Sequence, residues 1–354
     1  MSFKDNLLNS AKEISKYLAV KTVYDKVFSR VNRPNYLITP GLINIDRCSF
    51  NRIELEFYSN GNKLVGYYYP NNSNKLVVIC HGLRSGADDY LPFINYFIKN
   101  GFDCFSFNYA GTYESEGKNT YGMSESLVDL DNAIRFINNN ENLNKKELYL
   151  FGHSWGGFAV CSVLNIHKNI KAVASVSGFN DASTIIIDKG VFYGGKLAEL
   201  PKKYIDKYQE ELFENYLNYT ASSGINSSNA KILLAHGIFD LVIDFNYQSI
   251  ISHQKEFINP NVKYYIGDNS NKGHDSILYD ASAINYQKEV KKQMKKYDDE
   301  SNELKEYVSS IDNYKYSMVN EDLFKKIDSI INLKILFNLE ELWLEIHIIP
   351  RQKR

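Results

Sequence analysis

Short apolar runs alternate with longer helical patterns along most of the chain, and this alternation constrains the fold more than any other feature. The apolar runs lie near 75–80, 103–108, 147–151, 171–177, 231–235 and 262–266, and helical patterns fill 89–99, 123–139, 155–166, 244–257 and 281–297. Such alternation is typical of right-handed βαβ units. Two earlier β-type runs, 52–58 and 63–69, are joined by a hairpin-type turn. The sequence predicts an α/β fold with a mostly parallel central sheet flanked by helices.

Three segments fall outside this alternation. An amphipathic pattern over residues 3–31 predicts a helical arm that packs on the body or on a partner subunit. Between 181 and 228 the strands lapse, which predicts a helical cap inserted over the strand ends. We therefore expect a helical arm at 1–45, an α/β core at 46–180 and 229–300, a cap at 181–228 and a C-terminal helical extension at 301–354. The tail after residue 334 has no assigned partner.

Composition argues against several classes of function. Lysine and arginine number 41 against 42 acidic residues, so no net positive field attracts nucleic acid or anionic lipid. The four cysteines stand singly, without a CxxC pair, and are expected to be reduced thiols. Charged residues interrupt the N-terminal segment, and no apolar run reaches ~18 residues. We expect a cytoplasmic protein without a membrane-spanning segment.

A glycine-rich turn carries the first candidate for chemistry. The run 147–151 ends in Gly152-His153-Ser154-Trp155-Gly156-Gly157, and a helical pattern follows at once. Glycines in a GxSxG turn between strand and helix leave room for a sharp bend that raises the serine hydroxyl above the sheet. The spacing predicts Ser154 as a nucleophile.

A serine nucleophile needs a base and an acid to orient that base. His274 lies in a loop after the last predicted strand, whereas His81 and His236 precede glycines at strand ends, where they are expected to anchor loops. Asp240 follows the run 231–235 and is the preferred acid. Asp244 is its competitor, although it stands where a helix N-cap is expected.

The anion that forms during acyl transfer needs two fixed donors. We expect these to be the backbone N–H groups of Trp155, directly after Ser154, and of Leu83, in the loop after the run 75–80. In the cap, Phe192, Tyr193 and Tyr204 could bind substrate or could equally form the cap's own core.

These blocks resemble the α/β-hydrolase superfamily, and within it the branch of bacterial enzymes similar to serine aminopeptidases, monoacylglycerol lipases and feruloyl esterases. The similar blocks are His81-Gly82-Leu83 with Tyr90, residues 107–111 with 114–117, the GHSWGG turn, His236-Gly237 with Asp240, and Gly273-His274. The resemblance implies a serine hydrolase with Ser154, Asp240 and His274 as its triad, without metal or organic cofactor. Asn108 and Ala110 stand where the family usually has Asp and Arg.

The expected activity is cleavage of a carboxylic ester through an acyl-enzyme. Cleavage of small peptides or aminoacyl amides, acyl transfer, and a non-catalytic binding module on the same fold stay open as alternatives. The expected partner is a small ester or short peptide rather than nucleic acid, and a homo-oligomer stays open. A GxxxxGK pattern at 190–196 lacks the following Ser or Thr of a phosphate loop, and His274-Asp275 lacks the other ligands of a metal site.

Overall fold

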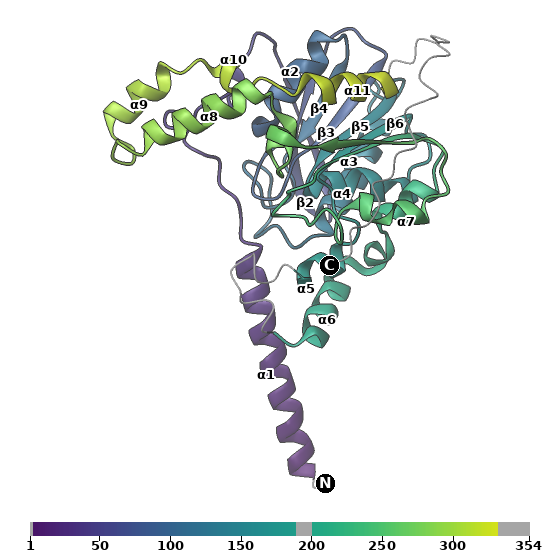
Figure 1. The fold of residues 1–354 in the computed structure, drawn as a ribbon. Helices are drawn as coiled ribbons and strands as arrows, with labels where there is room; N and C mark the ends of the chain where they lie inside the picture. Colours follow the sequence, from purple (N-terminus) through teal and green to yellow (C-terminus); the bar gives the residue numbers. More distant parts are fainter. Residues whose placement is uncertain (1–2, 189–199, 332–354) are drawn as a thin grey trace, which may run out of the picture.

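The computed structural model describes residues 3–188 and 200–331 of the chain, and their strands form one eight-stranded sheet (Figure 1). The strand order is β1-β2-β4-β3-β5-β6-β7-β8. The strands are β1 (Ile53–Ser59), β2 (Asn62–Tyr69), β3 (Lys75–Cys80), β4 (Asp103–Phe107), β5 (Glu147–His153), β6 (Ala172–Val176), β7 (Lys231–Gly237) and β8 (Val262–Gly267). β2 pairs antiparallel with β1 and β4, and all other neighbours are parallel. The predicted strands are therefore confirmed, with ends that differ by at most two residues.

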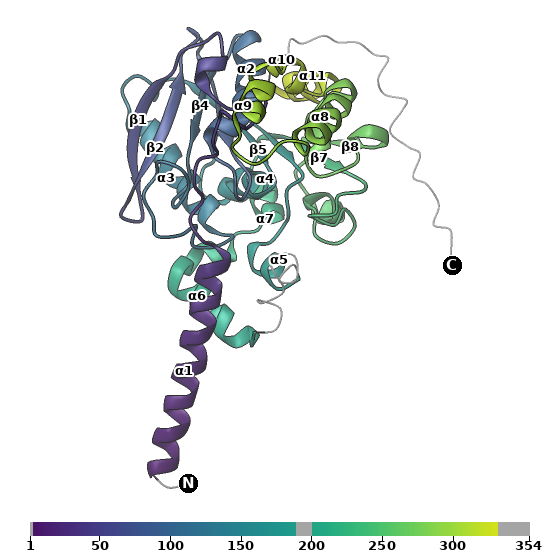
Figure 2. The same cartoon turned by 90° about the vertical axis from the view of Figure 1, so that its left-hand side faces the viewer.

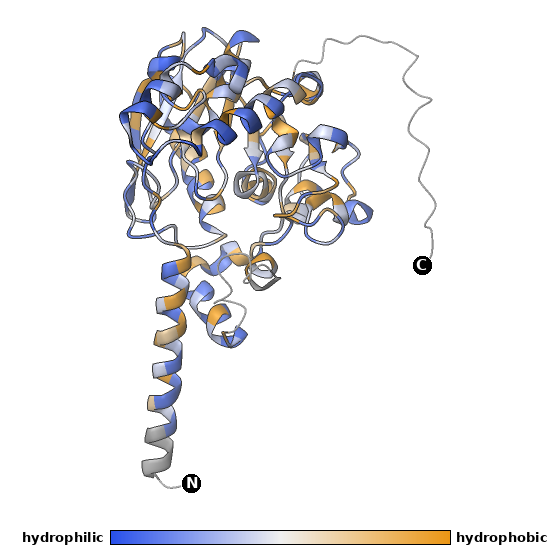
Figure 3. Cartoon of the chain, turned by 60° about the vertical axis from the view of Figure 1, so that its left-hand side comes forward, coloured by the Kyte–Doolittle hydropathy of each residue, from blue (hydrophilic) through white to orange (hydrophobic). Residues whose placement is uncertain are grey.

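The central strands are buried on both faces, which explains their continuous apolar runs. In β3, Leu76 and Val78 face one layer of the core, while Val77 and Ile79 face the other. Helices α3 (Glu125–Asn139), α4 (Trp155–Ser162) and α7 (Ala221–Asn226) cover the first face, and α2 (Leu91–Lys99) and α11 (Glu321–Ile331) cover the second. Figure 2 shows the sheet between these layers, and Figure 3 shows apolar residues gathered along the strands.

The segment 244–257 differs from its predicted helix. The structure places only a 3₁₀ helix there, from Ile250 to Glu256, which begins after Ser249. The carboxylate of Asp244 accepts hydrogen bonds from the amides of Asn246 and Tyr247, at 2.8 and 3.1 Å. Asp244 therefore closes a tight turn instead of starting an α-helix. The prediction of a helix over 244–257 was wrong.

The N-terminal segment forms one long helix, α1 (Phe3–Val27), which extends away from the body (Figures 1 and 2). Among the side chains of α1 that the structure describes, from residue 9 onward, the buried ones lie in its C-terminal part, at Val20 and Tyr24. Beside it lies α6 (Lys202–Phe213) of the inserted segment, which also contains α5 (Ala182–Asp188) and α7. The hydroxyl of Tyr208 donates to Asp25 at 2.6 Å, so polar contacts join α6 to α1.

The C-terminal segment returns to the body. After α8 (Ala281–Met294), α9 (Asn302–Ser309) and α10 (Asn313–Tyr316), α11 lies on the sheet. The amide of Leu42 donates to Ser317 Oγ at 2.9 Å, which ties this segment to the linker after α1. Among residues 3–188 and 200–331, no helix combines the length and apolar character needed to cross a bilayer. The proposed domain boundaries remain predictions.

Phe324 tests whether α11 belongs to the core. Its ring is fully buried and stacks on Phe93, with ring centroids 5.6 Å apart. We expect Phe324→Ala to lower the free energy of unfolding by about 3–5 kcal/mol, because it removes a buried ring and leaves a cavity. Urea unfolding monitored by circular dichroism measures the change. Met318→Ala, on an exposed side chain before α11, is the control and is expected to change stability by less than about 0.5 kcal/mol. Equal effects of the two substitutions would contradict a core role for α11.

Candidate active site

The strand order creates one place where loops from several strands meet. From β3 the chain crosses to β4 on one side, and β5 lies on the other side of β3. In open α/β sheets such a switch point leaves a crevice at the carboxyl ends of the strands. The loops after β3, β5, β7 and β8 all emerge at that edge. They carry Leu83, Ser154, Asp240 and His274, so the topology brings the predicted site residues to one edge.

Ser154 occupies a sharp turn between β5 and α4. Its backbone angles are φ 55° and ψ −113°, a conformation that a non-glycine residue rarely adopts. A side chain at Gly156 would place its Cβ 2.2 Å from the carbonyl oxygen of Cys80, and one at Gly152 would lie 2.2 Å from Gly156 O. Glycine is therefore needed at both positions, because three backbone segments approach each other closely there. This close approach holds Ser154 in the strained turn.

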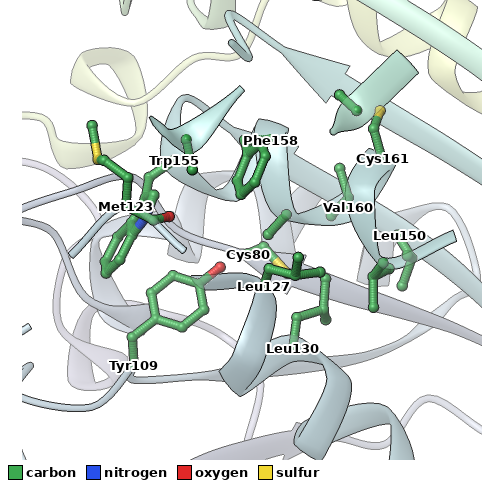
Figure 4. Close-up of a cluster of buried hydrophobic side chains, with 14 of the residues drawn as sticks. Cys80, Tyr109, Met123, Leu127, Leu130, Leu150, Trp155, Phe158, Val160 and Cys161 are labelled. Atoms are coloured by element: carbon green, nitrogen blue, oxygen red, sulfur yellow. The ribbon is translucent and has the colours of Figure 1, made fainter. Parts of the chain in front are cut away.

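Helix α4 fixes the turn from its other side. All eight of its residues are buried, and its first residue, Trp155, donates its indole N–H to the carbonyl oxygen of Met123 at 2.7 Å. Figure 4 shows Trp155 packed near Tyr109 and Met123, with Phe158 further along the helix. The turn is thus held by packing of α4 in which the side chain of Ser154 takes no part.

The structure brings His274 to Asp240. His274 Nδ1 lies 2.7 Å from Asp240 Oδ2. His274 and Ser154 line the same cavity. The hydrogen bonds of the described residues do not include one between Ser154 Oγ and His274. Bonds between nucleophile and base are often long without substrate.

Four groups hold Asp240. Its Oδ1 accepts from the amides of Val242 and Ile243, each at 2.8 Å, and its Oδ2 lies 3.1 Å from His236 Nε2 as well as near His274. Burial raises the pKa of Asp240, but the bonds from His236 and His274 outweigh it and hold the pKa well below its usual range. The competitor Asp244 serves its own turn instead.

The loop after β3 presents Leu83 to the cavity. His81 anchors this loop, since its Nδ1 lies 2.8 Å from Gly82 O and its Nε2 accepts from the amide of Tyr109 at 3.3 Å. Burial lowers the pKa of His81 to about 4, so the ring is neutral. Trp155 begins α4, and its amide is one of the first N–H groups of the helix, which have no carbonyl partner within it. The predicted anchoring by His81 and His236 is confirmed.

The cavity measures about 330 Å³. Its apolar wall includes Phe93, Leu278 and Tyr279, and its polar wall includes Arg84 and Asp275. A space of this size accommodates a small acyl or alcohol group beside Ser154.

The predicted substrate residues lie elsewhere or outside the described residues. Tyr204 contacts the N-terminal helix, because its hydroxyl donates to Glu13 at 2.5 Å and its ring lies 6.3 Å from that of Tyr17. It is not among the residues that line the cavity, and its role as a substrate residue stays a prediction. Phe192 and Tyr193, like the GxxxxGK pattern at 190–196, lie outside the described residues.

Sequence reasoning missed the contacts of two residues in the cavity wall. The hydroxyl of Tyr90 accepts from the amide of Gly82 and lies 2.8 Å from His153 Nδ1. His153 Nε2 lies 3.2 Å from the carbonyl oxygen of His274. The only signal in the sequence was their position, within the loop after β3 and inside the glycine-rich turn.

Three ligand atoms in the cavity could hold a metal ion. Those of His153, His274 and Asp275 all lie within 4.8 Å of one another. A cation held there would occupy the imidazole lone pair that a general base needs. A cation there would also have to displace the proton on His153 Nε2, which lies 3.2 Å from the carbonyl oxygen of His274, so these residues do not fit a resident metal cofactor.

Residues 71–212 match a family model described as "Serine aminopeptidase, S33". This match includes Ser154 and ends before Asp240 and His274. A similar curated protein is YfhR of Escherichia coli, an uncharacterised protein that is 27% identical over 206 residues. The match covers 56% of this chain and 66% of YfhR, slightly less than two thirds of that relative.

Solved structures resemble the fold over more of the chain. The Pyrococcus furiosus esterase Pf2001 has a TM-score of 0.54 and 21% identity, and the alignment covers 76% of this chain and 99% of that one. An acylaminoacyl peptidase bound to a chloromethyl ketone has a TM-score of 0.51 and 15% identity, with 74% of this chain and 44% of that one covered. At these identities the likeness establishes the fold.

The contacts of Asp240 predict how stability depends on pH. A carboxyl group whose folded pKa is depressed stabilises the fold above its unfolded pKa of about 4, and this stabilisation is lost as the pH falls. We expect the stability difference between wild type and Asp240→Asn to shrink by about 1 kcal/mol between about pH 5 and pH 3. Urea unfolding of both proteins across this range measures it. Parallel stability curves would contradict the depressed pKa.

Proposed function

We propose that the chain, which has the α/β-hydrolase fold, is a serine hydrolase that cleaves carboxylic esters. One observation carries the proposal: Ser154, in a strained strand-to-helix turn, lines the same cavity as His274, whose Nδ1 is bonded to the buried Asp240. Nucleophile, acid and base follow in this order along the chain, Ser154, Asp240 and His274, as in α/β-hydrolases.

Each residue has a defined step. Asp240 accepts a hydrogen bond from the Nδ1–H of His274, so that the Nε2 lone pair can take the proton of Ser154 as its oxygen attacks the ester carbonyl. The backbone N–H groups of Leu83 and Trp155 donate to the resulting oxyanion. His274 then protonates the leaving alcohol, and water, activated by the same imidazole, releases the acid from Ser154. The bond made to Ser154 is broken in the second half, so the enzyme is regenerated.

Amide cleavage is the second candidate. It is supported by the family described as serine aminopeptidase and by the acylaminoacyl peptidase of similar fold. The same triad also permits acyl transfer, in which an alcohol or amine replaces water. We rank ester cleavage first, because the esterase aligns over almost its entire length whereas the peptidase aligns over less than half.

We also propose that the protein works in the cytoplasm. Cys80, Cys104 and Cys161 are buried and unpaired, as is usual in a reducing compartment. Cell fractionation with an antibody against the protein tests this, and recovery outside the cytoplasmic fraction would contradict it.

Replacing the nucleophile tests the proposal directly. We expect Ser154→Ala and His274→Ala each to lower kcat by about 10⁴-fold or more on an ester that wild type hydrolyses. Reaction with a fluorophosphonate, followed by mass spectrometry, is expected to label wild type and to fail in Ser154→Ala. Ser329→Ala makes the same chemical change at an exposed site and is the control. An unreactive wild type would favour the non-catalytic binding module.

The substrate class is tested with a panel. We expect p-nitrophenyl acetate and butyrate to be hydrolysed faster than the palmitate, because the cavity of about 330 Å³ accommodates a short acyl group. Aminoacyl anilides are expected to react more slowly than the short esters. Turnover of anilides without turnover of esters would reverse the ranking, and Ser154→Ala serves as the blank throughout.

A further inference from the structure

We propose that His153 and Tyr90 are positioning residues. Together they fix the loop after β3 that carries Leu83, which we call the oxyanion loop, against the loop that carries the general base, His274. This inference rests on the proposed serine hydrolase reaction. We call the two side chains the Tyr90–His153 bridge. Neither belongs to the triad, and neither has been given a step in the reaction above.

The bridge is a continuous chain of hydrogen bonds. The amide of Gly82 donates to Tyr90 Oη at 2.8 Å, and Tyr90 Oη lies 2.8 Å from His153 Nδ1. His153 Nε2 lies 3.2 Å from the carbonyl oxygen of His274, which also accepts from Ser177 Oγ at 3.0 Å. One end of the chain is therefore the loop after β3, and the other end is the base itself.

Only one arrangement of protons satisfies all three contacts. The Gly82 amide always donates, so Tyr90 Oη accepts that bond and uses its single O–H to donate a hydrogen bond to His153 Nδ1. His153 then carries its proton on Nε2 and donates it to the carbonyl oxygen of His274. Burial supports these states, because it lowers the pKa of His153 to about 4 and raises that of Tyr90 well above its ordinary value.

The ends of the bridge adjoin groups that the reaction needs. Gly82 precedes Leu83, the proposed oxyanion donor, and His153 precedes Ser154. One imidazole therefore links the oxyanion loop, the nucleophile turn and the base loop. Catalytic groups misplaced by about 1 Å can lose roughly 10²-fold in rate. Such a link affects kcat more than substrate binding, because its bonds are not made to substrate.

The space around Gly82 shows how closely these parts fit. A Cβ at Gly82 would lie 3.1 Å from Tyr90 Oη, 3.5 Å from Ser154 Cβ and 3.6 Å from His153 Nδ1. Since His153 is bonded at both ring nitrogens, it has no lone pair with which to act as a base toward Ser154. Its position next to the nucleophile is therefore explained by orientation rather than proton transfer.

The test uses four variants of the full chain on the best ester of wild type. We expect Tyr90→Phe to lower kcat about 10-fold and His153→Leu about 100-fold, with KM within about 2-fold of wild type. His153→Gln can still accept and donate, and is expected to recover about 10-fold over His153→Leu. The double variant Tyr90→Phe/His153→Leu is expected to be no slower than His153→Leu, because both changes break one chain of bonds.

Tyr68→Phe is the matched control. It removes a tyrosine hydroxyl that donates to Asp103, at the end of the sheet opposite the cavity. It is expected to leave kcat unchanged, and thermal unfolding of every variant separates lost folding from lost rate. Where a variant does not fold, the bridge is tested instead on wild type, by nuclear magnetic resonance of the labelled histidines near pH 7. This measurement shows which ring nitrogen of His153 carries the proton. The bridge requires a neutral His153 with its proton on Nε2.

Separate results overturn separate claims. Wild-type turnover that depends on Ser154 but is unaffected by Tyr90→Phe and His153→Leu would overturn the bridge and leave the proposed function in place. Additive losses in the double variant, or a His153 proton on Nδ1, would do the same. Absence of any turnover that depends on Ser154 in wild type would overturn the proposed function and the bridge together.

Discussion

The close approach of three backbones around Gly152 and Gly156 is the constraint on which the rest of the site depends. It presses the start of α4 against the end of β3, so that Ser154 must leave the strand with a positive φ and rise above the sheet edge. Because β3 and β5 are neighbours at the switch point, this contact also sets the distance between Ser154 and the loop of Leu83. The loops after β7 and β8 then complete the candidate site around Ser154, whose position is already fixed.

Local spacing predicted much of this arrangement. Runs of buried β-type residues identified every strand, because parallel strands covered on both faces leave a continuous apolar signal. The α/β-hydrolase fold is thereby confirmed. The glycine-rich turn and the order of Ser154, Asp240 and His274 along the chain were readable for the same reason: each lies just after a strand, and the carboxyl ends of parallel strands share one edge. Tyr90 and His153 were visible as residues, but their bond depends on how two loops fold over that edge.

The helix predicted over 244–257 was wrong and the role of Tyr204 stays a prediction, because both depend on side-chain partners that sequence periodicity does not contain. The pattern over 244–257 has helical spacing, yet Asp244 bonds to the two amides that follow it and closes a turn before a helix can begin. Tyr204 belongs to an amphipathic stretch whose apolar face fits a pocket or another helix equally well. Its partner is Tyr17 of α1, about 190 positions away along the chain, and no local signal distinguishes these two cases.

The histidines show why one of them suits the role of base. His81 and His153 are each bonded at both ring nitrogens, and His236 is buried with its Nε2 shared between Asp240 and the carbonyl oxygen of Ile243. His274 is held at Nδ1 by Asp240, and no hydrogen bond engages its Nε2 in the part of the chain that the structure describes. A general base needs such a ring, fixed at one nitrogen and available at the other. The neighbouring imidazoles are bonded at both ring nitrogens or are buried. They therefore hold the loops in place and are not available for proton transfer.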